Sequence, residues 1–374
     1  MTDAFSGLIG HERVVRRLRT IVANETVPHA IIFHGARHVG KMTMVSALAA
    51  ALLGVEKAST HPDFRLVERP RDEKTDKLKK AIPIESIREL QQHLRMSSFL
   101  GGAKVAVIDG AEHLSEEAAN ALLKTLEEPT KRAYVLLSVE EKMRLPKTIV
   151  SRCASIGLDR VPDATVTEAL KALGVASFEA AKLAARADGR PGLARGFMEQ
   201  DDMVNWYETE ERRWRSLRGA PLHRRLAECA ALAPARADRE ETIERLRDVL
   251  DVWQGALRRE LKAGEPNAAA NLRGIIALRG SLTANVQPRL LLEKFALTLD
   301  RCYENAITFP RRCVRRAVAW RGLHPNHRYG RQRRYGRRGV SFHGSRFKMG
   351  FEIVDCHGWP GAQLRERERD GAGF

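Results

Sequence analysis

Cysteine is scarce in this sequence: its five cysteines lie far apart among 374 residues, and no two of them form a CxxC pair. Closely spaced cysteines mark structural zinc sites and the disulfide frameworks of small secreted proteins. Neither kind of framework is therefore expected here. The pattern is typical of a protein of the reducing cytosol, and we expect a cytoplasmic protein that holds no zinc.

Long hydrophobic runs are missing as well. No stretch approaches the roughly 18 apolar residues that a membrane-spanning helix requires. Residues 1–5 lack the charged and then apolar pattern of a signal peptide, and no internal repeat is present. We therefore expect no membrane association. At 374 residues and 43% hydrophobic content, the chain is long enough for two or three domains with cores of their own.

Positive charge is concentrated at the end of the chain. The net charge is +17, and residues 310–374 hold 16 Lys and Arg against 5 Asp and Glu, so they account for 11 of the 17 charges. The preceding part is only mildly basic. The last segment is rich in Arg, Gly and His, poor in aliphatic residues and without an amphipathic period, which predicts a basic disordered tail.

A glycine-bounded loop stands between an apolar run at residues 30–33 and a helix-like segment at residues 44–53. Gly35 and Gly40 enclose four residues, and Lys41 follows directly. A strand, such a loop and a helix N-terminus form the layout of a phosphate-binding P-loop, whose backbone amides face a polyphosphate. We predict a nucleotide-binding fold in which Lys41 can contact phosphate as a point charge.

The residue after Lys41 departs from that pattern. Met42 stands where a P-loop needs Ser or Thr, and methionine has no oxygen for Mg²⁺. Thr43 carries a hydroxyl one position later, but one helical step turns it by about 100° away from the phosphates. We therefore expect a degenerate site formed by Gly35, Gly40, Lys41 and Thr43, in which ATP and Mg²⁺ are bound at best weakly or structurally.

A second apolar run, at residues 104–109, ends in a carboxylate. Asp109 matches the strand-end aspartate that holds Mg²⁺ in P-loop ATPases, and Gly110 stands where such enzymes usually carry a glutamate that orients the attacking water. Glu112 lies three positions beyond Asp109, and we do not assign it that role. The alternative for Asp109 is a strand-end residue that caps the next turn.

The order of elements predicts an α/β domain. Expected strands at residues 30–33, 63–67, 104–109, 133–138 and 154–158 alternate with helical patterns, which favours a mostly parallel sheet covered on both faces. Gly35 and Asp109 would then lie together at the carboxyl ends of the strands, where such sheets bind ligands. After residue 161 the pattern is helical, first at residues 163–173, 177–187 and 192–199, then at residues 206–305.

Three further segments carry a resemblance to a known family. The run NALLKTLEEP at residues 120–129, the tripeptide SRC at residues 151–153 and VPHA at residues 27–30 are similar to motifs of the bacterial AAA+ clamp-loader family of DNA replication. By this resemblance Arg152 is an arginine finger, which enters a neighbouring subunit's ATP site and stabilises the charge of the transferring phosphoryl group. The alternative is a surface arginine in a turn.

The resemblance also implies an organisation and partners. It implies an AAA+ P-loop domain at residues 1–160, a helical lid at 161–205, a helical collar or oligomerisation domain at 206–305 and the basic tail at 306–374. The collar would assemble a hetero-oligomeric ring with delta and gamma/tau clamp-loader subunits of the DNA polymerase III holoenzyme. That ring acts on the sliding clamp and on primed DNA.

Departures from the family pattern favour a member that does not hydrolyse ATP itself. Met42 and Gly110 weaken the site, Arg152 is retained, and Gly192 stands where the family has an ATP-sensing arginine, a role that Arg190 should not inherit. The family's four-cysteine zinc module is also absent. The alternatives are an active gamma/tau-like ATPase and a DNA-binding accessory protein that acts through the tail. The tail itself is a DNA-binding arm, an inert extension or an out-of-frame translation.

Overall fold

The computed structural model describes residues 3–72, 76, 78–99, 102–282 and 286–299. By its contacts the chain divides into two units, and the described residues all belong to the first, residues 1–306. The predicted tail at residues 306–374 lies outside the described residues. Within the described ranges, no helix is both long enough and apolar enough to cross a membrane.

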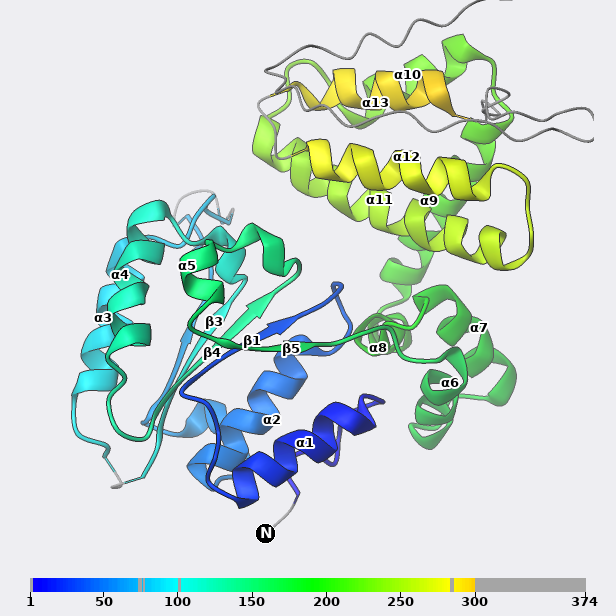
Figure 1. Cartoon of the computed structure of the whole chain (residues 1–374). Coiled ribbons are helices and arrows are strands. Elements are labelled where there is room, and N and C mark those ends of the chain that lie inside the picture. Colours follow the sequence, from blue (N-terminus) through cyan, green and yellow to red (C-terminus); the bar gives the residue numbers. More distant parts are fainter. Residues whose placement is uncertain (1–2, 73–75, 77, 100–101, 283–285, 300–374) are drawn as a thin grey trace, which may run out of the picture. The chain divides into compact units, whose positions relative to one another are not determined.

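One five-stranded sheet organises the first half of the chain (Figure 1). Its strand order is β2-β3-β4-β1-β5, and all four pairings are parallel. The predicted α/β fold with a parallel sheet is therefore confirmed. The strands are β1 (Ala30–His34), β2 (Phe64–Val67), β3 (Lys104–Asp109), β4 (Ala133–Val139) and β5 (Ala154–Gly157).

Helices cover both faces of this sheet, as the near-continuous apolar strands predict. Alternate residues of each strand enter different cores: Ile32 of β1 lies with α3 and α4 residues, whereas Ile31 lies with α1 and α2 residues. Figure 1 shows α3 and α4 on one side of the sheet and α1 and α2 on the other. The helices of this half are α1 (Glu12–Ala23), α2 (Lys41–Leu53), α3 (Ile84–Arg95), α4 (Glu116–Glu127) and α5 (Lys147–Val150).

The short connections of this half carry local structure as well. Three 3₁₀ turns occur, at Ala58–Thr60, Ala111–His113 and Lys142–Arg144. Neither these turns nor α5 was expected from the sequence, because segments of three or four residues are too short to show a period. Ser115 caps the start of α4: its side chain accepts a hydrogen bond from the Ala118 amide.

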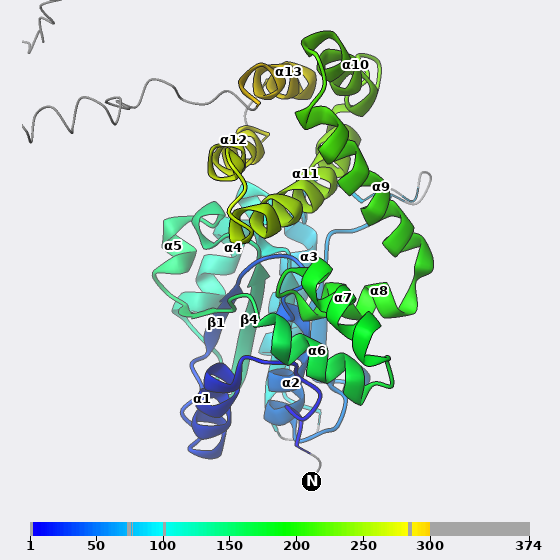
Figure 2. The same ribbon diagram turned by 90° about the vertical axis from the view of Figure 1, so that its right-hand side faces the viewer.

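The second half is entirely helical over its described residues. Buried side chains from residue 161 to residue 299 form one hydrophobic core, which includes a row of apolar residues along α11. There α10 lies beside α13 and α11 beside α12 (Figure 1, Figure 2). The helices are α6 (Asp163–Ala172), α7 (Ser177–Ala187), α8 (Pro191–Glu199), α9 (Asp201–Arg218), α10 (Leu222–Leu232), α11 (Arg239–Lys262), α12 (Ala268–Ser281) and α13 (Pro288–Thr298).

Some details of the helical half differ from expectation. Helix α8 begins at Pro191 rather than at residue 192, since proline is well suited to the first helical position. On α13, Leu290 is 55% exposed whereas Leu292 is buried. The expected boundary between residues 205 and 206 lies inside α9. The division into lid and collar remains a prediction.

Candidate functional site

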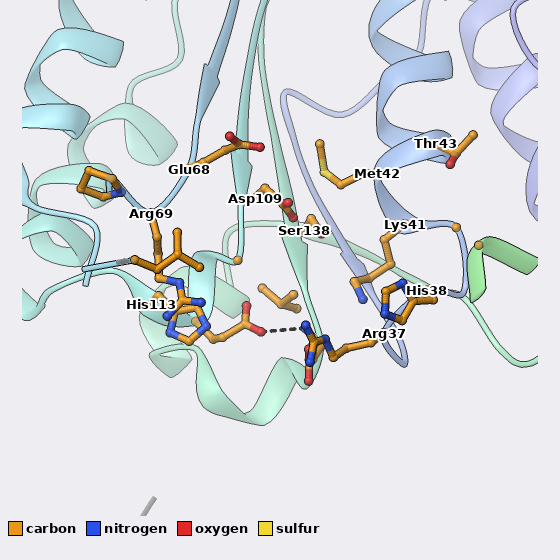
Figure 3. Close-up of a pocket in the computed structure, with 18 of the residues that line it drawn as sticks. Arg37, His38, Lys41, Met42, Thr43, Glu68, Arg69, Asp109, His113 and Ser138 are labelled. Atoms are coloured by element: carbon orange, nitrogen blue, oxygen red, sulfur yellow. Dashed lines mark hydrogen bonds and ion pairs between the residues drawn. The ribbon is translucent and has the colours of Figure 1, made fainter. Parts of the chain in front are cut away.

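A pocket of about 820 Å³ lies at the carboxyl ends of β1, β3 and β4 (Figure 3). Gly40, Lys41 and Thr43 line it together with Asp109, so the structure brings these four predicted residues to one place. Gly35 shapes the loop behind them. A Cβ atom at Gly35 would lie 2.3 Å from the Leu158 carbonyl oxygen, so only glycine fits there.

The glycine before the lysine has a conformational role. Gly40 precedes α2 with φ of 104°, a left-handed value that residues with a Cβ atom rarely adopt. This turn brings Lys41 into the pocket at the start of the helix. There Lys41 Nζ donates hydrogen bonds of 2.9 Å to the carbonyl oxygens of Gly35 and Ala36. Its ammonium group thus binds the backbone of its own loop.

Burial also acts on the charge of Lys41. It lowers the pKa of the ammonium group, while the negative charges of Glu140, Glu112 and Asp109 act in the opposite direction. Nearby carboxylates therefore compensate part of the charge of Lys41, while the positive charge of Arg37 adds to the lowering. A polyphosphate entering this pocket would meet these carboxylates together with Arg37, Arg69 and Arg71, which also line it.

The two residues after Lys41 lie as the helical step predicts. Figure 3 shows Met42 on the side of α2 that faces Asp109 and Ser138, and Thr43 projects away from that side. The thioether of Met42 thus occupies the direction in which a P-loop places its metal-binding hydroxyl. Both Met42 and Thr43 line this pocket and also a neighbouring hollow, which Gly7 and Leu8 line as well.

Asp109 ends β3 beside β4, in register with Ser138. The turn that follows begins at Gly110, with φ of 67°, and Gly110 has no side chain with which to cap it. The role of Asp109 remains a prediction. Over the described residues, no group of three or more His, Cys, Asp or Glu side chains is arranged to hold a metal ion.

Glu112 is a pocket residue that the sequence alone did not promote. One carboxylate oxygen accepts a hydrogen bond of 3.0 Å from the Glu140 amide, and the other is buried without a hydrogen-bond partner within the described residues. Burial raises the pKa of this carboxyl group. Glu112 is thus held by the Glu140 amide, directly after β4, and lies two residues beyond Gly110, the position at which P-loop ATPases usually carry the catalytic glutamate.

A chain of alternating charges runs along one side of the pocket. Arg37, a residue of the P-loop itself, forms ion pairs with Glu140 at 3.3 Å and with Asp248 of α11. Arg279 of α12 bridges Glu140, at 3.1 Å, and Asp251 of α11. These ion pairs share carboxylates and join the P-loop and the end of β4 to two helices of the second half. Such a network stabilises a structure more than isolated surface ion pairs do.

The start of α8 closes the pocket from another side. The Gly192 amide donates a hydrogen bond of 2.9 Å to the His38 carbonyl oxygen of the P-loop. A Cβ atom at position 192 would lie 2.9 Å from that same oxygen, so the position of the ATP-sensing arginine here accepts only glycine without a shift. Arg190 is 2% exposed and pairs with Asp251 at 3.5 Å. Through Asp251, Arg190 belongs to the same chain of alternating charges as Arg279.

Arg152 lies apart from this pocket, in the turn between α5 and β5. Its side chain is 37% exposed, and Nη2 forms an ion pair of 2.6 Å with Glu127 at the end of α4. Nη1 donates hydrogen bonds to the Thr148 carbonyl oxygen at 3.0 Å and to Ser151 Oγ at 3.4 Å. Arg152 is not among the residues that line this pocket. It presents a held guanidinium group at the surface.

Sequence reasoning missed the residues that enclose the pocket. Arg37 occupies a variable position of the P-loop, and its partner Asp248 lies 211 residues later, so no local pattern links them. Glu127 lies in the motif at residues 120–129, and Arg152 lies in the motif at residues 151–153. Because both motifs belong to the same resemblance, their joint presence was a signal that could have linked the two residues.

Comparisons with known proteins agree with the resemblance. Residues 10–162 match the family described as "DNA polymerase III, delta subunit". The chain is 30% identical over 199 residues to DNA polymerase III subunit delta' of Escherichia coli, which covers 49% of this chain and 57% of that protein. It is 31% identical over 193 residues to subunit delta' of Haemophilus influenzae, again over 57% of the relative.

Another relative is a tau/gamma subunit. DNA polymerase III subunit tau/gamma of Haemophilus influenzae is 29% identical over 173 residues, which cover 44% of this chain and 25% of that protein. The chain thus spans between a quarter and little more than half of the length of these relatives. A solved gamma subunit-related protein of Thermotoga maritima aligns with a TM-score of 0.38 at 18% identity, over 75% of this chain and 97% of that one.

Proposed function

Because residues 10–162 match the family model and the chain is similar to delta' subunits, we propose that it is the delta-prime subunit of a DNA polymerase III clamp loader. In this role it joins a ring with delta and gamma/tau subunits that places the sliding clamp on primed DNA. It supplies Arg152 to the ATP site of a neighbouring subunit and hydrolyses little or no ATP in its own pocket.

The observation that carries the proposal is the contrast between two cations of this chain. In the P-loop pocket, Lys41 binds its own backbone, and Met42 and Gly110 stand where a hydroxyl and a glutamate are needed. At the surface, Arg152 retains donors that a neighbour's phosphates could engage. An arginine that stabilises the charge on a transferring phosphoryl group acts with full effect from a neighbouring subunit.

The test is a reconstituted loader with the Arg152→Ala variant of this chain. We expect assembly to be unchanged by size-exclusion chromatography. Of the several ATPase sites in the ring, only one receives this arginine. The burst of ATP hydrolysis in a rapid-quench experiment should therefore be smaller by one ATP per ring. An unchanged burst with an intact assembly would contradict the role of Arg152.

The second candidate is an active gamma/tau-like ATPase. It is favoured by the tau/gamma relative, whose identity of 29% is close to that of the delta' relatives. It requires ATP turnover by the purified chain on its own. We expect none above background, and turnover that the Lys41→Ala variant abolishes would establish this candidate instead.

A further inference from the structure

The last residue of α4, Glu127, contacts the guanidinium group of Arg152 directly. We propose that Glu127 is the positioning residue of the arginine finger: it fixes the orientation in which Arg152 meets the neighbour's phosphates. This proposal rests on the proposed function of Arg152. The contact is an ion pair of 2.6 Å between Glu127 Oε1 and Arg152 Nη2, short enough to be a charge-assisted hydrogen bond.

The guanidinium group is held at three points from two directions. Glu127 binds Nη2, while the Thr148 carbonyl oxygen, at 3.0 Å, and Ser151 Oγ, at 3.4 Å, bind Nη1. Contacts on two different nitrogens fix the plane of a rigid group, which one contact cannot do. Because a guanidinium group carries five N–H donors, these three contacts leave two for a phosphate.

Both sides of this arrangement are anchored in the core. Leu126, which precedes Glu127, is 2% exposed, and Ser115 caps the other end of α4. Ile149 of α5 is fully buried just before the turn that carries Arg152, and α4 packs against α5. The carboxylate and the backbone carbonyl that hold the arginine are therefore themselves fixed, as a preorganised catalytic group requires.

The same contact contributes little to the stability of the fold. The Glu127 and Arg152 side chains are 48% and 37% exposed, and ion pairs of this exposure stabilise proteins only slightly in water. An arginine without its partner keeps many rotamers, and each productive encounter would then have to order it again. Loss of Glu127 should therefore lower the rate of hydrolysis and leave thermal unfolding unchanged.

The experiment compares four variants of the full chain in the reconstituted loader: Glu127→Ala, Glu127→Gln, Arg152→Ala and the double variant Glu127→Ala/Arg152→Ala. Glu128→Ala is the matched control, because Glu128 is the exposed neighbour at the end of the same helix. Rapid-quench hydrolysis gives the rate constant of the ATP equivalent that depends on Arg152, and titration with ATP gives its KM.

We expect Glu127→Ala to lower that rate constant about tenfold with KM and melting temperature unchanged, because a misplaced group loses rate rather than substrate binding. Glu127→Gln, which keeps an oxygen acceptor, should restore part of the rate. The double variant should be no slower than Arg152→Ala, since Glu127 acts only through the arginine.

Two results would overturn the proposal while leaving the proposed function intact. Glu127→Ala could behave like Glu128→Ala while Arg152→Ala loses its ATP equivalent, which would make the ion pair irrelevant. A faster rate in Glu127→Ala would show that the carboxylate withholds the finger instead of positioning it. If Arg152→Ala itself has no effect, the finger role fails first, and the positioning role fails with it.

Discussion

The pocket around Lys41 and the turn around Arg152 hold their cations in different ways. Lys41 is enclosed by pocket residues, donates to two carbonyl oxygens of its own loop and lies among three carboxylates. Arg152 is partly exposed and is held by one carboxylate, one carbonyl oxygen and one hydroxyl. The first cation is engaged within the chain, whereas the second keeps donors for a partner.

Packing around the Lys41 pocket requires two glycines. Gly35 is required because the Leu158 carbonyl oxygen approaches it closely, and Gly192 because α8 donates to the P-loop at His38. The shape of the P-loop is therefore tied to its packing against neighbouring elements. That the loop lacks ATPase chemistry remains a prediction, which rests on Met42 and Gly110.

The largest expected effect comes from replacing Arg152 and, for comparison, Lys41 by alanine in the reconstituted assembly. Arg152→Ala should slow hydrolysis at the one composite site on the order of 1000-fold, the scale of other arginine fingers. Lys41→Ala should leave the burst unchanged within about twofold. Rapid-quench kinetics measures both, and a large loss in Lys41→Ala would mean that this chain's own pocket takes part in hydrolysis.

The next effect concerns the ion pairs that enclose the pocket. Arg190→Ala removes a 2% exposed arginine from Asp251, which keeps its ion pair with Arg279, so the free energy of unfolding should fall by about 3 kcal/mol. The matched control is Arg195→Ala on the same helix, where the pair with Glu199 is exposed. Urea unfolding measures both, and equal losses would show that burial of the charge is not the cause.

A smaller effect is expected on the pH dependence of stability, through His113, which lines the pocket. Burial, with the nearby charges of Arg69, Arg247 and Arg144, lowers the pKa of His113 to about 4 from its usual 6.5. Between these values the unfolded chain binds a proton that the folded chain does not, so stability must fall as the pH falls from 6.5 towards 4.

His113→Asn should therefore lose less stability than the unmodified chain between pH 7 and pH 5, by about 1 kcal/mol. Urea unfolding at the two pH values measures the difference. Identical losses in both proteins would show that His113 titrates normally. Arg152→Ala, on the other side of the comparison, should leave this pH dependence as it is.

The smallest effect concerns the N-cap of α4, the helix whose last residue, Glu127, holds Arg152. Ser115→Ala removes the side-chain acceptor of the Ala118 amide at the start of α4 and should cost about 1 kcal/mol of unfolding free energy. Ser115→Asp, which offers another good cap, should restore it. Urea unfolding measures the free energy of unfolding of both variants. If Ser115→Ala is as stable as the unmodified chain, α4 is fixed by its packing alone.

Local patterns were sufficient to predict most elements. The strand at residues 104–109 was predicted because its apolar signal lies within one segment. Short segments were not predicted: α5 spans only Lys147–Val150, yet it sets the turn that carries Arg152. The start of α8 was placed at residue 192, one residue late, because a pattern fixes the bounds of a helix less well than its existence.

The sequence by itself determined the parallel sheet, the P-loop between β1 and α2, and the absence of a hydroxyl at Met42, because these depend on residue type and local order. Only the tertiary structure decided that Arg37 binds Asp248, that Gly192 meets His38 and that Glu127 holds Arg152. Such contacts join side chains or backbone groups of different elements, and their geometry follows from the packing of whole helices rather than from any pattern within one segment.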